Sequence, residues 1–150
     1  MRYRARDLSD RNTMDSAMSF KSFALFAAAL CVAPQSSAAV EHTQDSLETV
    51  KRNVAADKAI MVDVRERIEW KNGHVADAVL VPMSQLEKRT LPADTLGKLP
   101  KDRILYTYCI VGMRARKAAD VLEKQGYQVR PLKPGFDELR KAGFPTADGD

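Results

Sequence analysis

The sequence predicts an α/β fold built on a parallel sheet with helices on both faces. Short apolar segments typical of buried strands alternate with helical segments at least three times along the chain. Parallel strands need such crossovers, because each connection must return the chain to the same end of the sheet. Apolar residues make up 45% and charged residues 29% of the 150 residues, an ordinary composition for one globular domain.

The first half of the domain begins with a helix, predicted by Leu47, Val50 and Val54 at spacings of three and four. Residues 59–64 (AIMVDV) are almost wholly apolar, as expected of a strand that is covered on both faces. The helical pattern after this strand stops at an Asn-Gly pair, which favours a turn. The next predicted elements are a helix over 65–71, a strand over 78–81, a helical turn over 84–87 and a helix over 94–99.

The second half contains the best strand of the sequence, residues 103–108 (RILYTY), which are rich in aromatic and β-branched side chains. A helix over 114–125 should follow, with one apolar face, and Gly126 favours its end. That face consists of Ala115, Ala118, Ala119 and Leu122. The last predicted elements are a strand over 128–132 and a helix over 136–141.

The first 39 residues are predicted to be a signal peptide. Residues 23–33 (FALFAAALCVA) form an apolar run that is too short for a membrane span of about 20 residues. Small residues at 37 and 39 suit cleavage before Val40, and Met18 is an alternative start. An uncleaved anchor or a buried helix is the alternative interpretation. We expect a periplasmic or secreted protein, without stable membrane insertion after cleavage, that has a mobile segment over 40–46 and a folded domain over 47–150.

The formal net charge of +4 is spread too evenly to indicate a nucleic-acid partner. Residues 1–39 hold five cations and three anions, and the remaining residues hold 19 cations and 17 anions. Cleavage of the signal peptide would leave Cys109 as the one cysteine. An exported domain with a single thiol cannot form an internal disulfide, so Cys109 is either buried and inert or exposed and reactive.

Cys109 stands at the carboxyl end of the strongest strand, where parallel-sheet folds bind their ligands. The loop after it can turn several backbone N–H groups toward one point, a nest that the following helix continues. Arg114 and Arg116 add positive charge. These groups should favour the thiolate and hold the charge of a persulfide or an oxyanion.

An inert cysteine is the alternative, since cysteine is often a small buried side chain at a strand end. Arg114 and Arg116 would then be ordinary residues of the first helical turn. Cations at a helix N-terminus oppose the helix dipole, however, and their presence favours an anion at the loop. The reactive interpretation is favoured, and the inert one stays open.

The pattern Cys-x-x-Gly-x-Arg at 109–114 resembles the active loop of rhodanese sulfurtransferases. The other similar segments are Asp63-Val64-Arg65, Glu69-Trp70, Gly73-His74-Val75, Ala78, Val81-Pro82, Gly126-Tyr127 and Gly135-Phe136. The resemblance extends from Leu47 to Phe144. It is greatest to the small exported single-domain type represented by phage-shock protein E.

The resemblance implies a three-layer α/β/α fold with a five-stranded parallel sheet. It also implies a sulfurtransferase in which Cys109 is the nucleophile and carries sulfane sulfur as a persulfide. The implied partners are a small sulfane-sulfur donor and a thiol or cyanide acceptor, without a cofactor. The loop that would bind the substrate consists of Ile110, Val111, Gly112, Met113 and Arg114.

For other residues the same resemblance implies structural roles. Asp63 and Arg65 would be scaffold, Trp70 would belong to the core, and His74 would at most position another group. Two positions depart from the family, which often has a charged residue where Ile110 stands and an aromatic residue where Leu139 stands. Both departures argue against thiosulfate as the natural donor.

Two other functions are considered on the same scaffold. Phosphatases and arsenate reductases place five residues between cysteine and arginine, whereas four precede Arg114 and Ala115 occupies the next position. A non-catalytic or redox-sensing module is the stronger alternative. No metal site is expected, because His42, His74 and one distant cysteine do not form a zinc-ligand set.

Overall fold

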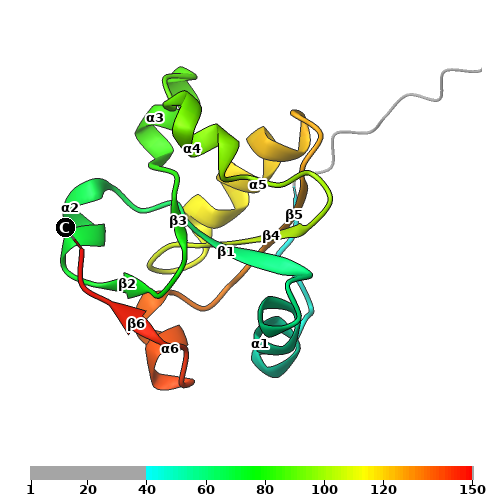
Figure 1. Ribbon diagram of the computed structural model, residues 1–150, viewed down its shortest axis with the longest axis vertical. Coiled ribbons are helices and arrows are strands. Elements are labelled where there is room, and N and C mark those ends of the chain that lie inside the picture. Colours follow the sequence, from blue (N-terminus) through cyan, green and yellow to red (C-terminus); the bar gives the residue numbers. More distant parts are fainter. Residues whose placement is uncertain (1–39, 150) are drawn as a thin grey trace, which may run out of the picture. The chain divides into compact units, whose positions relative to one another are not determined.

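A four-stranded parallel sheet forms the centre of the computed structural model, which describes residues 40–149 (Figure 1). The middle strands are in register from Ala59 opposite Ile104 to Asp63 opposite Tyr108. Both strands therefore end at the same edge of the sheet, immediately before Cys109 on one of them. In spatial order the strands are β3 (Val79–Leu80), β1 (Ala59–Asp63), β4 (Ile104–Tyr108) and β5 (Gln128–Pro131).

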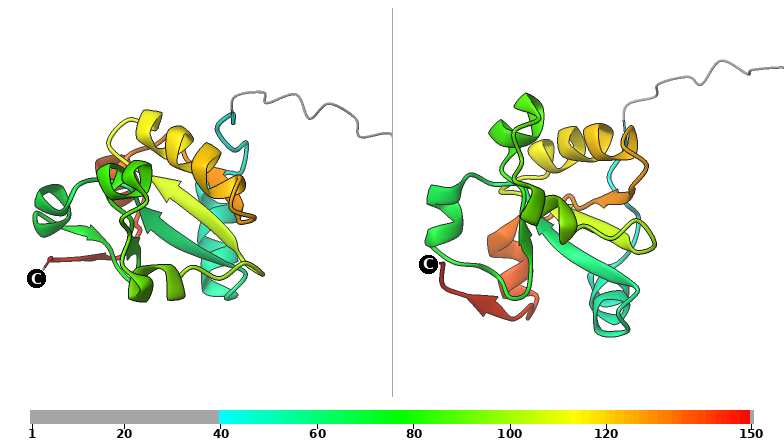
Figure 2. Two further views of the ribbon diagram at one scale, coloured as in Figure 1. Left: turned by 90° about the horizontal axis from the view of Figure 1, so that it is seen from above. Right: turned by 45° about the horizontal axis from the view of Figure 1, so that its top comes forward.

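Helices cover both faces of this sheet, as Figures 1 and 2 show. One face carries α3 (Met83–Lys88), α4 (Ala93–Gly97) and α5 (Met113–Glu123). The opposite face carries α1 (Leu47–Ala55) and α6 (Phe136–Lys141). The short α2 (Arg67–Lys71) follows β1 at the end of the sheet where Cys109 lies. None of the helices within residues 40–149 has the length and apolar character needed to cross a membrane.

The side chains of β4 alternate between two hydrophobic clusters, one on each face of the sheet. Leu105 and Cys109 belong to the cluster beneath α3 and α5, whereas Tyr106 and Tyr108 belong to the cluster beneath α1 and α6. Successive strand residues point to opposite faces, so the register of β4 directs Cys109 toward α5. The buried hydroxyl of Thr107 donates to the carbonyl oxygen of Ala115 at 3.1 Å and ties the strand to that helix.

The predicted apolar face of α5 is confirmed. Ala115, Ala118, Ala119 and Leu122 are all fully buried. Three alanines on one face let the helix approach the sheet closely, because they add little bulk between the two backbones. This close packing fixes the first turn of α5 directly above the end of β4.

The α/β class with a parallel sheet and helices on both faces is confirmed, but the expectation of five parallel strands is wrong for the described residues. The four strands predicted from the residues themselves are the four observed. The other strand pair is a separate antiparallel one, β2 (His74–Val75) with β6 (Thr146–Ala147). Gly73, with φ +105°, redirects the chain before β2, which then pairs with the C-terminal segment instead of extending the main sheet.

Residues 40–46, for which the sequence predicts mobility, make defined contacts with the domain. The N–H of Thr43 donates to the carbonyl oxygen of Pro131 at 2.8 Å. The carboxylate of Asp45 accepts from the hydroxyl of Tyr106 and from Arg130, both at 2.6 Å. The predicted signal peptide, residues 1–39, lies outside the described residues.

Candidate active site

Cys109 lies at the junction of β4 and the loop that leads to α5. Only 1% of the surface of Cys109 is exposed to solvent. Its carbonyl oxygen accepts a hydrogen bond of 2.9 Å from the N–H of Phe136. The carbonyl oxygen of the preceding Tyr108 accepts from the N–H of Val64 at 3.0 Å. The backbone at Cys109 is therefore held by both the β1 side and the start of α6.

The loop after Cys109 has free backbone donors. Within residues 40–149, no backbone N–H from Ile110 to Ala115 donates a hydrogen bond. The first three of these donors belong to the loop, and the other three to the first turn of α5, where N–H groups have no partner inside the helix. Six consecutive free donors, joined to the positive end of a helix dipole, can stabilise an anion.

Two glycines let other backbone segments approach this loop closely. Gly112 has φ +81°, and a β-carbon there would lie 2.6 Å from Nε2 of His42 and 2.9 Å from the carbonyl oxygen of Lys133. A β-carbon on Gly135 would collide with the backbone of Ile110. The loop is thus enclosed by the β5–α6 connection and by the N-terminal segment, and any side chain at either glycine would displace it.

Arg114 is directed to Glu69 on α2. It donates two hydrogen bonds of 2.7 Å to the two carboxylate oxygens. These hydrogen bonds lower the pKa of Glu69 below its usual value and raise that of Arg114, and a charge on Cys109 contributes a smaller part of the rise. The pair is bidentate, a geometry that gives both strength and direction. Arg114 therefore ties the first turn of α5 to α2, with its charge partly neutralised.

Asp63 and Arg65 form a second, buried pair at the end of β1. Arg65 donates to Asp63 at 2.6 Å and to the carbonyl oxygen of Gly73 at 2.8 Å. Burial alone would lower the pKa of Arg65, but its hydrogen bonds to Asp63 and the charge of that carboxylate raise the pKa. The guanidinium lies 4.4 Å from the centre of the Phe136 ring. These contacts agree with the scaffold role expected of both residues.

Three other residues named in the sequence analysis have positions that the sequence alone does not specify. Trp70, expected in the core, is only partly buried, and its ring stacks on that of the buried His74 with the ring centroids 3.3 Å apart. Nδ1 of His74 also lies 3.3 Å from the carbonyl oxygen of Trp70, so both contacts of the His74 ring are with Trp70. Leu139, the buried residue of α6, packs into the hydrophobic cluster on that face of the sheet, so it cannot touch a donor at the loop.

His42, like Glu69, is a partner of the loop that the sequence did not reveal. Its Nε2 lies 3.2 Å from the carbonyl oxygen of Gly112, which can only accept, so Nε2 carries the proton of this hydrogen bond. Seventy residues separate the two in the chain. No local pattern could have revealed the contact, because it depends on how residues 40–46 run along the domain.

A cavity of about 270 Å³ lies beside the cysteine loop. Its lining combines the exposed side chain of Ile110 in the loop with the ring of Phe136 and with charged side chains from α2, from α6 and from the segment that follows β1. Arg140 is paired there with Asp137 at 3.0 Å. The lining residues are Arg65, Glu69, Asn72, Ile110, Phe136, Asp137 and Arg140.

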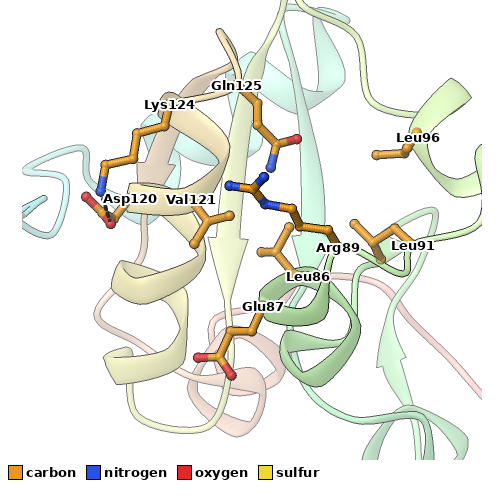
Figure 3. Close-up of a pocket in the computed structure, with 9 residues that line it drawn as sticks. All are labelled: Leu86, Glu87, Arg89, Leu91, Leu96, Asp120, Val121, Lys124 and Gln125. Atoms are coloured by element: carbon orange, nitrogen blue, oxygen red, sulfur yellow. Dashed lines mark hydrogen bonds and ion pairs between the residues drawn. The ribbon is translucent and has the colours of Figure 1, made fainter.

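Two larger cavities, of about 550 and 600 Å³, lie along α5. The first is enclosed by α3, α4 and the second half of α5, where Arg89 extends between the helices and Lys124 pairs with Asp120 on the rim (Figure 3). Neither cavity is lined by Cys109 or Arg114, so neither contains the reactive constellation. No group of three histidine, cysteine or acidic side chains in the described part of the chain could hold a metal ion.

Comparison with known proteins places the chain in a family. The family model for the rhodanese-like domain matches residues 46–142, so the chain belongs to the rhodanese-like domain family. A sulfurtransferase of Allochromatium vinosum is 30% identical over 102 residues, which cover 67% of this chain and 90% of that protein. The thiosulfate sulfurtransferase GlpE of Coxiella burnetii is 30% identical over 61% of this chain and 79% of its own length.

Other relatives are much longer than the segment that matches this chain. The chain spans 59% of YqhL and 47% of the putative sulfur carrier protein YrkF, both from Bacillus subtilis, at 36% and 32% identity. Among solved structures, the Alr3790 protein from Anabaena sp. has a TM-score of 0.58 at 24% identity, covering 70% of this chain and 80% of that one. This likeness supports the fold alone.

Proposed function

We propose that this member of the rhodanese-like family is a sulfurtransferase that carries sulfur as a persulfide on Cys109. The observation that carries the proposal is the run of six free N–H donors from Ile110 to Ala115, directly after the cysteine. Sulfurtransferases at about 30% identity add support. Three of these donors are those that any helix N-terminus leaves free, and the loop adds the three N–H groups of Ile110, Val111 and Gly112 directly beside the cysteine.

The proposed reaction has two displacement steps. The Cys109 thiolate attacks the outer sulfur of a donor; with thiosulfate, the S–S bond breaks and its electron pair leaves on sulfite. The product, Cys109–S–S⁻, keeps one negative charge near the free donors. An acceptor thiolate or cyanide then attacks the outer sulfur, and the electron pair of the S–S bond returns to Cys109. The N–H groups stabilise the anion at each stage without moving.

The burial of Cys109 is the feature that the inert interpretation also predicts, since the residue is 1% exposed. A persulfide adds a sulfur atom that reaches further toward the loop mouth, which reconciles a buried cysteine with transfer to an outside acceptor. A phosphatase is disfavoured because the arginine that would bind a tetrahedral oxyanion is engaged by Glu69. A redox sensor remains the alternative function for the same thiol.

Mass spectrometry distinguishes these functions. After incubation with thiosulfate or polysulfide, the intact protein should gain one sulfur atom at Cys109 and lose it to cyanide. Oxygen adducts without a cyanide-labile sulfur would support the sensor. An unmodified thiol under both treatments would support the inert cysteine.

We also propose that the protein is exported, with residues 1–39 acting as a signal peptide, and that it is of the small single-domain type represented by phage-shock protein E. The apolar run over 23–33 and the small residues before Val40 support this proposal. Sequencing the N-terminus of protein from the periplasm or medium tests it. Cytoplasmic protein that retains the apolar run would contradict it.

A further inference from the structure

The segment before α1 is bound to the domain at several points along its length. Residues 40–45, which we name the N-terminal strap, run beside β5 on the way to α1 (cyan in Figure 1). Every residue of the strap except Gln44 forms a hydrogen bond or an ion pair with a residue outside the strap. These contacts fall into two groups, one at the cysteine loop and one on the strands β4 and β5.

The first group holds the beginning of α5. Arg116 donates from Nε to the carbonyl oxygen of Val40 at 2.8 Å and pairs with Glu41 at 3.3 Å. His42 donates from Nε2 to the carbonyl oxygen of Gly112 at 3.2 Å. The same oxygen accepts the N–H of Arg116 at 3.1 Å, which is the first hydrogen bond of α5. The strap therefore contacts the helix exactly where its first turn closes.

The contact at Gly112 acts on the proposed anion site. The carbonyl group of Gly112 and the N–H of Met113 belong to one planar trans peptide, so they point in opposite directions. Holding the carbonyl oxygen therefore fixes the direction of the Met113 N–H, one of the six free donors after Cys109. Glycine restricts its own backbone little, so this peptide group needs an external contact to hold it.

The second group of contacts, which we name the latch, lies away from the loop. The carboxylate of Asp45 accepts from the hydroxyl of Tyr106 and from Arg130, both at 2.6 Å. The hydrogen bond from Tyr106 lowers the pKa of Asp45 below its usual value, so the carboxylate is charged at neutral pH. Tyr106 belongs to the hydrophobic cluster beneath α1 and α6, whereas Cys109 belongs to the cluster on the opposite face. The latch can therefore be altered without touching the cysteine.

The two groups of contacts are close together along the chain. Only Thr43 and Gln44 separate His42 from Asp45, a span of at most about 10 Å. The N–H of Thr43 is itself bound to the carbonyl oxygen of Pro131 at 2.8 Å. Because each hydrogen bond alone is weak, the strap stays in place only while its contacts act together.

We propose that the N-terminal strap is a conformational switch for Cys109. While the latch holds the strap, the cysteine loop keeps the form in which the thiol is reactive, and release of the strap lowers that reactivity. This inference goes beyond the proposed function, because it concerns any reaction of the thiol. The alternative is that the strap only covers β5, which is an edge strand of the sheet.

Two measurements on the whole chain test the switch. Release of the strap is measured by the rate at which a glutamyl endopeptidase cuts after Glu41. Reactivity is measured by the rate at which iodoacetamide modifies Cys109 at neutral pH, followed by mass spectrometry of the peptide that contains it. We expect Tyr106→Phe and Asp45→Ala each to speed the cut severalfold and to slow alkylation about three- to tenfold, as for loss of one hydrogen bond.

Tyr127→Phe is the matched control. Tyr127 is partly buried and lies beneath Lys101, just before β5 and at the opposite end of that strand from Pro131, where the strap binds. Removal of its hydroxyl should change neither rate. Thermal melts verify that each variant is folded.

A double variant shows whether the latch acts through the loop contact. If it does, His42→Ala combined with Tyr106→Phe should slow alkylation no more than His42→Ala alone, because the same contact is lost in both. Effects that multiply would mean that Tyr106 acts on Cys109 by another route, and the switch would be overturned.

The remaining outcomes are equally decisive. A faster cut after Glu41 with unchanged alkylation would show that the strap only covers the sheet edge, and faster alkylation would show that it shields Cys109. An unchanged cut in both latch variants would show that the latch does not hold the strap. Each of these results overturns the switch. If wild-type Cys109 follows the expected alkylation pattern but is not loaded by polysulfide, sulfurtransfer fails and the switch stands.

Discussion

Arg114 donates two hydrogen bonds of 2.7 Å to the carboxylate of Glu69, although 45 residues separate them in the chain. The pair joins the first turn of α5 to α2. It therefore holds in place the C-terminal end of the loop that follows Cys109. An arginine in this position acts on Cys109 chiefly by holding the loop, because its charge is shared with a carboxylate. The first two predictions test that relationship.

The stability that the pair contributes should depend on pH. Glu69 has a lower pKa in the fold than its usual 4.5, so below that value the unfolded chain binds more protons than the folded one. The contribution is present above about pH 4.5 and is lost as the pH falls through the folded pKa. We expect Glu69→Gln to cost about 1 kcal/mol in free energy of unfolding at pH 7, and almost nothing in strong acid.

Urea unfolding of wild type and Glu69→Gln at several pH values measures this difference. Glu87→Gln is the matched control, because Glu87 is exposed and forms no ion pair among the described residues. A difference that stays constant down to acid pH would mean that Glu69 stabilises the fold through its shape and not through its charge.

Alkylation of Cys109 by iodoacetamide separates charge from geometry at Arg114. If Arg114 acted only through its charge, Glu69→Gln would free the guanidinium and speed alkylation, while Arg114→Ala would slow it. We expect both variants to slow alkylation at neutral pH, since both release the loop. Arg116→Ala should have a smaller effect, because Arg116 binds the carbonyl oxygen of Val40 instead. Faster alkylation in Glu69→Gln would refute the geometric role.

His42 should be a positioning residue for the loop. Its hydrogen bond to the carbonyl oxygen of Gly112 orients a peptide group in the middle of the proposed anion site. We expect His42→Ala to lower kcat about three- to tenfold, as for one hydrogen bond, with little change in KM. His42→Asn should restore part of the activity, because its amide can donate to the same oxygen. Equal losses in both variants, with lowered melting temperatures, would indicate a merely structural contact.

The fold was predictable where local pattern determines it. The four parallel strands and the apolar face of α5 follow from side chains that must be buried, so the residues themselves reveal them. The antiparallel pair of β2 and β6 was missed, because each has two residues and their pairing depends on the turn at Gly73. A fifth parallel strand came only from the resemblance.

The part of the candidate site that consists of consecutive residues was predictable from the sequence. The loop after Cys109 could be located from a strand, a glycine and a helix in succession. Its partners could not, because Glu69 and His42 reach the loop from distant segments, and an ion pair between separate elements leaves no periodic signal. The role of Arg114 therefore changed from a nearby positive charge to a tie between two helices.

Thiosulfate should be a poor donor, and Ile110 is the reason. Its side chain is 54% exposed and lines the cavity beside the loop, so it points outward and offers hydrocarbon where a sulfonate would lie. We expect Ile110→Arg to lower the KM for thiosulfate about tenfold with little change in kcat, as for a contact made equally in ground and transition states. If kcat and melting temperature fall together without a gain in KM, the side chain instead packs into the protein.

The persulfide on Cys109 is tested most directly with Cys109→Ser, which is nearly isosteric. Wild type and variant are incubated with polysulfide, and cyanide-labile sulfur is measured by intact-protein mass spectrometry beside thermal melts. We expect one labile sulfur atom on wild type, none on the variant, and melting temperatures within a few degrees, because serine replaces the thiol at the loop with little change in volume. Labile sulfur on the variant, or its absence from wild type together with a large drop in the variant's melting temperature, would contradict a sulfur-carrying role for Cys109.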